Sequence, residues 1–522
     1  MKHLQRQLFT FILLLSINPL HAQVKIPHNQ KEDLAHTMSD KYWAQWDETT
    51  QKQIDENIAR YRMADTTIVI PGLPARAKVH VELVKHRFFF GAHIFNYNQL
   101  GSYEANAKYR ELWGTLFNSA TVAFYWKTFE DQPGRVRFRK KYWDTEEYWN
   151  EQKDPAYQMH WRRPSTDQVV DYLTQRGIRI HGHPFIWGNR KWHHPDWIDT
   201  TLPNNEEKEF LHKMVTERAT LQNYKDGDVF SEAYKALSPS QLSDSLPHYA
   251  ERLHEAFDQR IQRIAKHYGD RIESWDVVNE STVDYVTGCF KEPKPLCKSV
   301  YGIMPGDYVY NAFQTAAPLF GKKVKLNIND YNTSQAYTDW INELIQRGCR
   351  IDVVGSQMHL FNPQQCLDLA EGKTDGGLPT PEHVQKVMST LSKAALPIHL
   401  SEITITAPGN DERGQMIQAI LARNLYRLWF SIPRMEGITW WNVVDNCGAP
   451  GEPSVSGIFS REMKPKPAYF ALDELINHEW HTSLDLQPSE KERLSFRGFR
   501  GTYLISWKDR KGKLHTMNME LK

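Results

Sequence analysis

The amino-acid sequence predicts an α/β fold, a (β/α)8 TIM barrel with additions at both ends. Longer stretches with helical periodicity, such as TDQVVDYLTQRG and DERGQMIQAILARNLYRLWF, separate several short apolar runs. A strand followed by a helix, repeated eight times, is typical of such a barrel, and 522 residues suit one large barrel with additions. The eight apolar runs are residues 88–94, 120–126, 178–187, 272–280, 324–332, 351–360, 396–405 and 437–445.

The first 22 residues have the features of a signal peptide. Lys2 and Arg6 make the start basic, and the apolar stretch over 8–20 is too short to span a bilayer as a stable helix. Ala22 is a small residue at a plausible cleavage point. No later segment is long and apolar enough for a membrane span, so we expect a secreted or periplasmic protein.

The rest of the chain divides into three parts. Residues 23–87 are predicted as an N-terminal extension, helical at first and then a β-hairpin around a Pro-Gly turn. Residues 88–478 form the barrel domain, and residues 479–522 form a small β appendage. Two intervals, 135–166 and 188–248, are too long for simple connections and are expected to be insertions over one face of the barrel.

Charge and cysteine content narrow the function classes. The 64 Lys and Arg nearly cancel the 63 Asp and Glu, so a nucleic acid is not expected as a partner. The five cysteines lack paired metal-binding spacing. Cys289 and Cys297 bracket a short loop, and the spacing leaves open whether they form a disulfide bridge.

The ends of the apolar runs carry polar residues that a barrel core does not explain. Catalytic groups of (β/α)8 barrels lie at the carboxyl ends of the strands, and burying a charge there is costly without a functional reason. Glu280 and Glu402 each end such a run. The full set of polar residues is Asn96, Asn98, His183, Asn279, Glu280, Asn329, Asp330, Gln357, His359, Glu402 and Asp445.

Two carboxylates that face one pocket indicate cleavage of a glycosidic bond. One carboxyl group is held protonated and protonates the leaving oxygen, while the other stays ionised as nucleophile. A retaining mechanism requires a separation of roughly 5–5.5 Å. Zinc binding by His183, His359 and Glu402 is the competing interpretation, and it is disfavoured because no two of them share a short helical spacing.

The motifs in this order resemble glycoside hydrolase family 10, whose characterised members are mostly endo-β-1,4-xylanases. The resemblance covers roughly three-quarters of the chain, from about Phe88 to Tyr469. The segments that carry it are FGAHIFNYNQL, WKTFEDQPG, GHPFIW, WDVVNE, INDYN, GSQMHL, SEITI, ITWWNVVDN and MKPKPAY.

The resemblance implies a role for each matched residue. Glu280 is expected to be the acid/base and Glu402 the nucleophile. Asn279 and His183 are expected to bind the sugar at the cleavage point, and Gln357 and His359 to contact or orient the nucleophile. The other expected substrate-binding residues are Trp187 and Trp441, as aromatic walls, together with Tyr125 and Asn98.

Four positions depart from the family pattern beside the catalytic pair. Val122 replaces an Asn, and Tyr125 replaces a Lys that binds the glycone sugar. Gly188 stands where a His usually follows the Trp, and Thr404 where an Asp follows the nucleophile. The change from Lys to Tyr removes a charged donor and adds a stacking face. These departures affect sugar recognition and leave the carboxylate pair unchanged.

We therefore expect retaining hydrolysis of a β-linked plant-type polysaccharide, most similar to endo-β-1,4-xylanase activity, by a monomer that needs no cofactor or metal. An alternative is the same mechanism on a non-xylan or decorated β-glycan, including exo action if the insertions close one end of the cleft. A further alternative is a non-catalytic carbohydrate-binding barrel.

Overall fold

The computed structural model describes residues 24–522 apart from 75, 221, 222, 224, 292, 293, 489 and 491. The predicted signal peptide lies outside the described residues.

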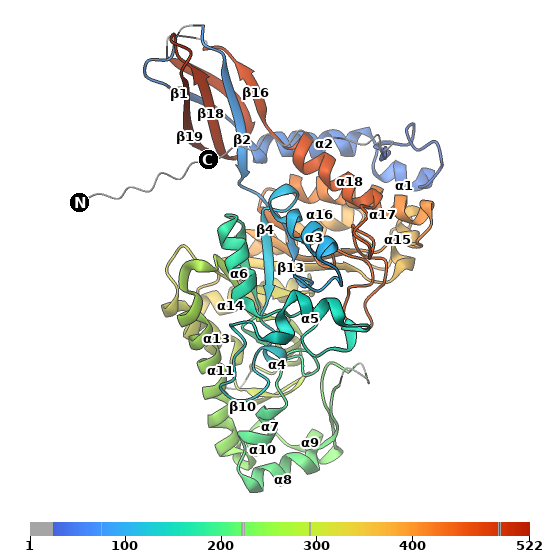
Figure 1. Ribbon diagram of the computed structural model, residues 1–522. Coiled ribbons are helices and arrows are strands. Elements are labelled where there is room, and N and C mark those ends of the chain that lie inside the picture. Colours follow the sequence, from blue (N-terminus) through green and yellow to red (C-terminus); the bar gives the residue numbers. More distant parts are fainter. Residues whose placement is uncertain are drawn as a thin grey trace, which may run out of the picture.

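A closed parallel sheet forms the centre of the molecule, as the sequence predicted (Figure 1). Neighbouring barrel strands run parallel to each other, and the pairing of the fourth barrel strand with the fifth closes the ring. The short β6 (Ile186–Trp187) pairs with β9 beyond the end of β5. The eight barrel strands are β3 (Phe89–His93), β4 (Ser119–Ala123), β5 (Arg179–His183), β9 (Ser274–Asn279), β12 (Lys325–Asp330), β13 (Val353–Leu360), β14 (Ile398–Ile405) and β15 (Met435–Trp440).

Helices cover the outside of the barrel. Each one buries an apolar face against the sheet; α17, for example, begins after Asp411, whose side chain accepts a hydrogen bond from the Gly414 amide. The main covering helices are α3 (Tyr103–Thr115), α6 (Thr166–Gln175), α11 (Pro247–Tyr268), α13 (Tyr308–Ala316), α14 (Gln335–Gln346), α15 (Pro363–Ala370), α16 (Pro381–Leu391), α17 (Glu412–Ser431) and α18 (Pro467–Asp473).

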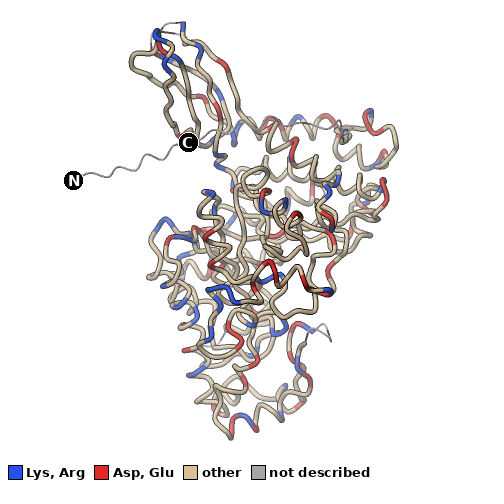
Figure 2. The backbone as a smooth tube through the Cα atoms, viewed as in Figure 1, with Lys and Arg blue, Asp and Glu red and all other residues tan. Residues whose placement is uncertain are grey.

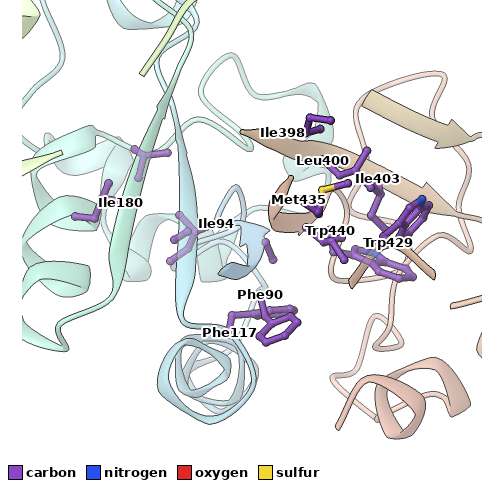
Figure 3. Close-up of a cluster of buried hydrophobic side chains, with 14 of the residues drawn as sticks. Phe90, Ile94, Phe117, Ile180, Ile398, Leu400, Ile403, Trp429, Met435 and Trp440 are labelled. Atoms are coloured by element: carbon purple, nitrogen blue, oxygen red, sulfur yellow. The ribbon is translucent and has the colours of Figure 1, made fainter. Parts of the chain in front are cut away.

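The core lies between this sheet and its helices. Figure 3 shows part of it, in which Leu400 and Ile403 of β14 and Trp440 of β15 gather with Trp429 of α17. On the outer face of the barrel, Gly182 of β5 lies against Trp275 of β9, so closely that a Cβ at residue 182 would overlap the indole ring. The absence of a side chain at Gly182 therefore makes room for the tryptophan.

The two ends of the chain combine into one β-unit at an end of the molecule (Figure 1). The predicted hairpin is wrong, because its two strands pair with strands of the C-terminal appendage and not with each other. β1 (Met63–Val69) pairs with β17 (Arg493–Phe499), and β2 (Val79–His86) lies between β16 (Ser483–Leu486) and β18 (Gly501–Lys508). β19 (Leu514–Leu521) pairs with β18.

The β-unit is remote from the carboxyl ends of the barrel strands. Only Arg87 and Phe88 separate β2 from the start of β3, so the β-unit adjoins the amino ends of the strands. In Figure 1, α2 (Glu48–Arg62) lies next to the β-unit, and α1 (Asp40–Gln45) lies beyond α2.

The predicted insertions contain short elements. The interval 135–166 includes α5 (Glu146–Glu151), and α4 (Trp126–Phe129) precedes it. The interval 188–248 lies at the end of the molecule opposite the β-unit (Figure 1). Its elements are α7 (Trp197–Thr201), α8 (Asn205–Met214), β7 (Val215–Glu217), β8 (Val229–Phe230), α9 (Glu232–Ala236) and α10 (Pro239–Ser245), and α12 (Thr282–Thr287), β10 (Leu296–Ser299) and β11 (Gly302–Pro305) come later.

Charges of both signs are interspersed over the backbone (Figure 2), consistent with the net charge of +1. No helix within the described ranges has the length and apolar character needed to cross a membrane. All five cysteines are free thiols, so Cys289 and Cys297 are not bridged.

Candidate active site

Local backbone irregularities aim the two predicted catalytic glutamates into the barrel mouth. Glu280 follows β9 directly and has φ +55°, a left-handed conformation that is rare for residues other than glycine. Its amide donates to the Asn329 carbonyl at 2.7 Å, which holds this turn. Glu402 lies within β14, where the register with β13 shifts so that Gln357 faces Glu402 and Ser401 bulges out.

One side-chain amide joins the two carboxylates. Nε2 of Gln357 donates to Oε1 of Glu280 at 2.9 Å and to Oε1 of Glu402 at 3.2 Å. The distance between the two accepting oxygens therefore cannot exceed the sum of these two hydrogen-bond lengths. That limit is shorter than the separation of about 6.5–9.5 Å that leaves room for a water molecule in inverting enzymes.

Burial makes both carboxyl groups weak acids. It raises the pKa of Glu280 to about 8, with the charge of Glu402 as the second cause. It raises the pKa of Glu402 to about 7, and the nearby His183 opposes this rise. Because the two groups interact, they titrate as a pair, and Glu280 is the one that retains its proton to higher pH.

Donors surround Glu402 and favour its ionised form. Asn329 Nδ2 donates to its Oε1 at 2.8 Å, and His359 Nε2 lies 3.3 Å from its Oε2. Thr404 Oγ1 lies 2.9 Å from Nδ1 of His359. Burial lowers the pKa of His359 to about 4, so the ring is neutral, donates from Nε2 and accepts from Thr404 at Nδ1. Thr404 thus orients His359 without the charge that an Asp would add.

His183 connects Glu402 to a buried aspartate. Its Nδ1 lies 2.7 Å from Oδ2 of Asp276, and its Nε2 lies 3.7 Å from Oε1 of Glu402. His181 also bonds to Asp276, at 2.9 Å. Burial opposes ionisation of Asp276, but the two histidines outweigh it and hold the pKa of Asp276 below its usual range. The carboxylate of Asp276 therefore fixes the orientation of the His183 ring.

Asn279 belongs to a buried amide network under the carboxylates. Its Oδ1 accepts from Asn329 Nδ2 at 2.9 Å, and Oδ1 of Asn329 accepts from Ser401 Oγ at 2.6 Å. Asn279 Oδ1 is also 3.4 Å from Gln357 Nε2. These bonds fix the side chain of Asn279 beside Gln357 and Asn329.

Aromatic rings form the walls beside the pair. Trp187 Nε1 donates to Oε2 of Glu280 at 2.9 Å. The Trp441 ring packs edge-on against His359, with centroids 5.6 Å apart, and the Tyr125 ring packs edge-on against His183, also at 5.6 Å. A pocket of about 310 Å³ opens between Tyr125, Trp187 and Trp441. Sugar rings bind to such walls by stacking their apolar faces.

The structure groups nine of the ten predicted site residues at the barrel mouth and places Asn98 elsewhere. The side-chain oxygen of Asn98 accepts a hydrogen bond from Arg110, which also pairs with Glu146 of α5. Asn98 is thereby tied to the 135–166 insertion, and its role in substrate binding stays a prediction.

Three more residues lie near the carboxylates or line the pocket, and the sequence pattern did not identify them. Tyr301, in the turn between β10 and β11, places its hydroxyl 3.4 Å from Oε2 of Glu280. Arg162 and Arg163 come from the 135–166 insertion and line the pocket. Their positions follow from how loops fold over the barrel, which strand periodicity does not report.

The zinc alternative has no geometric support. Within the part of the chain that the structure describes, the group of potential metal ligands that lie within 4.8 Å of one another is His28, Glu474 and Glu479. His183, His359 and Glu402 do not form such a group.

Comparisons with known proteins agree with the geometry. Residues 234–475 match the profile of Glycosyl hydrolase family 10. Exoglucanase XynX of Acetivibrio thermocellus is 24% identical over 321 residues, which are 59% of this chain and 24% of that protein. Endo-1,4-beta-xylanase A of Halalkalibacterium halodurans is 24% identical over 304 residues, 55% of this chain and 63% of that protein.

Among solved structures, xylanase 10B from Thermotoga maritima aligns with a TM-score of 0.49 and 19% identity, over 75% of this chain and 96% of the other. This chain spans less than two-thirds of the length of the curated relatives given above. The profile match includes β9 and β14, the strands that carry Glu280 and Glu402. Over residues 234–475 the chain is therefore similar to glycosyl hydrolase family 10, at low identity to the relatives given above.

Proposed function

We propose that this protein is a retaining glycoside hydrolase that cleaves β-linked, xylan-type polysaccharide. The observation that supports it most directly is the bridge from Gln357 to both Glu280 and Glu402, which keeps the carboxylates at a separation suited to double displacement. The names of its relatives, which include endo-1,4-beta-xylanases, favour xylan as substrate.

The unequal environments of the two carboxyl groups assign their roles. Glu280 has the higher pKa and holds a proton near pH 7, so it protonates the leaving oxygen. Glu402, whose oxygens accept bonds from Asn329 and Gln357, attacks the anomeric carbon and forms a glycosyl ester.

The second step follows from the loss of one charge. Once Glu402 is esterified, its negative charge no longer raises the pKa of Glu280. Glu280, which has given up its proton, then acts as the base that takes a proton from water. The water attacks the anomeric carbon from the side that the leaving group left, and the configuration is retained.

Secretion is part of the proposal. It is supported by the basic and apolar features of residues 1–22. N-terminal sequencing of the protein recovered outside the cytoplasm would test it: a chain that starts after Ala22 is expected, and an intact N-terminus there would contradict it.

The decisive experiment is to incubate the purified full chain with plain xylan, decorated xylans and other β-glycans. Product sizes are read by chromatography and anomeric configuration by NMR at early times. We expect xylo-oligosaccharides of mixed length with retained configuration. Release of single terminal units would indicate exo action, and inverted products would disprove double displacement.

Variants separate catalysis from binding. Glu402→Ala is expected to abolish turnover and to preserve the fold, whereas Glu371→Ala, on the surface after α15, is the matched control and should retain activity. Substantial hydrolysis by Glu402→Ala would refute the nucleophile assignment. Binding of glycans without any hydrolysis by the wild-type protein would favour the non-catalytic alternative.

A further inference from the structure

The pocket beside the carboxylate pair is lined by an excess of positive charge. Three of its residues are basic, Arg162, Arg163 and Lys191, and Glu452 is its acidic residue. A neutral xylose unit offers hydroxyl groups, which do not require several cations. A neutral xylose unit therefore does not explain the positive charge of this pocket.

Arg163 is the cation most open to a ligand. Its side chain is stacked with its guanidinium carbon 4.5 Å from the centre of the Tyr125 ring and 5.5 Å from that of Trp192. The residue is only 9% exposed, and burial lowers the pKa of Arg163 to about 10. Across the described residues, no carboxylate or carbonyl is bonded to its guanidinium. A buried cation without an anion is costly, and a bound anion would offset that cost.

Glu452 does not neutralise the pocket. Its oxygens already accept bonds from Trp441 Nε1 at 3.0 Å, from Asn442 Nδ2 at 2.9 Å and from the Ala449 amide at 2.7 Å. Its single charge is shared with Arg162, whose Nη1 lies 3.5 Å away.

Arg162 adds a second incompletely bonded guanidinium. Its Nη2 donates to Asn442 Oδ1 at 2.7 Å and its Nη1 forms an ion pair with Glu452, whereas its buried Nε has no hydrogen-bond partner among the described residues. Arg162 also stacks on Phe95, with 4.2 Å between its guanidinium carbon and the ring centre. Arg162 is therefore largely engaged, and the guanidinium of Arg163 beside it is the one suited to a carboxylate or a sulfate.

We propose that this pocket binds an anionic sugar unit of the substrate, one that carries a carboxylate or a sulfate ester, with Arg163 as its principal ligand. The inference rests on the proposed hydrolase function and specifies its substrate class. The family resemblance predicts a Lys on the second strand, where this chain has Tyr125. Arg163, from the 135–166 insertion, stacks on the ring of Tyr125 and places a cation there.

The test measures binding and not turnover. Full-length Glu402→Gln protein is titrated calorimetrically with a glucuronic-acid-substituted xylo-oligosaccharide, with the same compound after reduction of its carboxyl group, and with a sulfated xylo-oligosaccharide. The titrations are repeated with Arg163→Gln added, and with Arg139→Gln, an exposed arginine of the same insertion, as matched control.

At least one anionic ligand is expected to bind about tenfold more tightly than the neutral one, as a charge-assisted pair allows. The two anionic arms identify which group is bound. Arg163→Gln should bring the ratio to within about twofold of unity, Arg139→Gln should leave it unchanged, and Arg163→Lys should retain part of it. Circular dichroism and melting temperature establish that each variant is folded.

Two outcomes separate this inference from the proposed function. Equal binding of anionic and neutral ligands, or an equal loss of both in Arg163→Gln, would overturn the anionic pocket while xylan hydrolysis by the wild-type protein stands. Preferential anion binding by a protein that hydrolyses no glycan would support the pocket and refute the hydrolase.

Discussion

Gly188 makes room for Tyr301. A Cβ built on Gly188 would lie 2.5 Å from Cδ2 of the Tyr301 ring, closer than real contacts allow. Tyr301 in turn places its hydroxyl 3.4 Å from Oε2 of Glu280. The departure from the family pattern at residue 188 is therefore linked to the position of Tyr301 beside Glu280.

This link predicts coupled mutational effects. Gly188→Ala should force the Tyr301 ring away from Glu280 and lower kcat/KM by about tenfold, a loss in the range of small misplacements at a reaction centre. The same change in a Tyr301→Ala background should have no further effect, because the clash is absent. Additive losses in the double variant would show that residue 188 acts independently of Tyr301.

Removal of the shared donor should impair the chemical step. Gln357→Leu loses the hydrogen bonds to Glu280 and Glu402. The value of kcat should fall by about 100-fold, which is the usual effect of removing one hydrogen-bond donor where charge develops in the transition state. Since the Gln357 bond lowers the pKa of Glu280, that pKa should rise further in the variant. Gln364→Leu, on the exposed start of α15, is the control and should match the wild type. A Gln357→Leu enzyme with normal kcat would contradict the role of the bridge.

The pH dependence of kcat/KM should be bell-shaped. Activity needs Glu402 ionised and Glu280 protonated, so it should decline below about pH 7 and above about pH 8, following the raised pKa values of the two groups.

In Glu402→Gln, loss of the neighbouring charge should lower the pKa of Glu280, which a carbon-13 NMR titration of the carboxyl group would show. An unchanged pKa would mean that burial alone raises it.

The contact of Gly182 with Trp275 predicts a loss of stability. Gly182→Ala would overlap the indole ring between the sheet and its helices and should lower the free energy of unfolding by about 1–3 kcal/mol, the usual cost of overpacking. Gly321→Ala, where an added Cβ meets no atom within 4 Å, is the matched control. Denaturant titrations of both variants measure the difference, and equal stabilities would disprove the packing argument.

The barrel was predictable because its strands are local patterns. Each apolar run, such as the one that contains β14, is long enough to form a buried strand, and polar residues at its end stand out. The hairpin was not predictable, because alternation identifies β1 and β2 as strands but does not name their partners. Those partners, β17 and β18, come from the other end of the chain. The hydrogen bond of Asn98 to Arg110 is a similar case, since residues near a strand end are directed by the loops around them.

The sequence by itself determined the order of strands and helices, the two candidate glutamates and the family that the chain resembles, because these are properties of residue type and spacing. The tertiary structure alone decided what surrounds the glutamates: the left-handed turn at Glu280, the bulge beside Glu402, Tyr301 in the space left by Gly188, and Arg163 over Tyr125. These contacts join residues far apart in the chain. Their energies depend on burial and on distances of a few ångströms, which only the folded chain establishes.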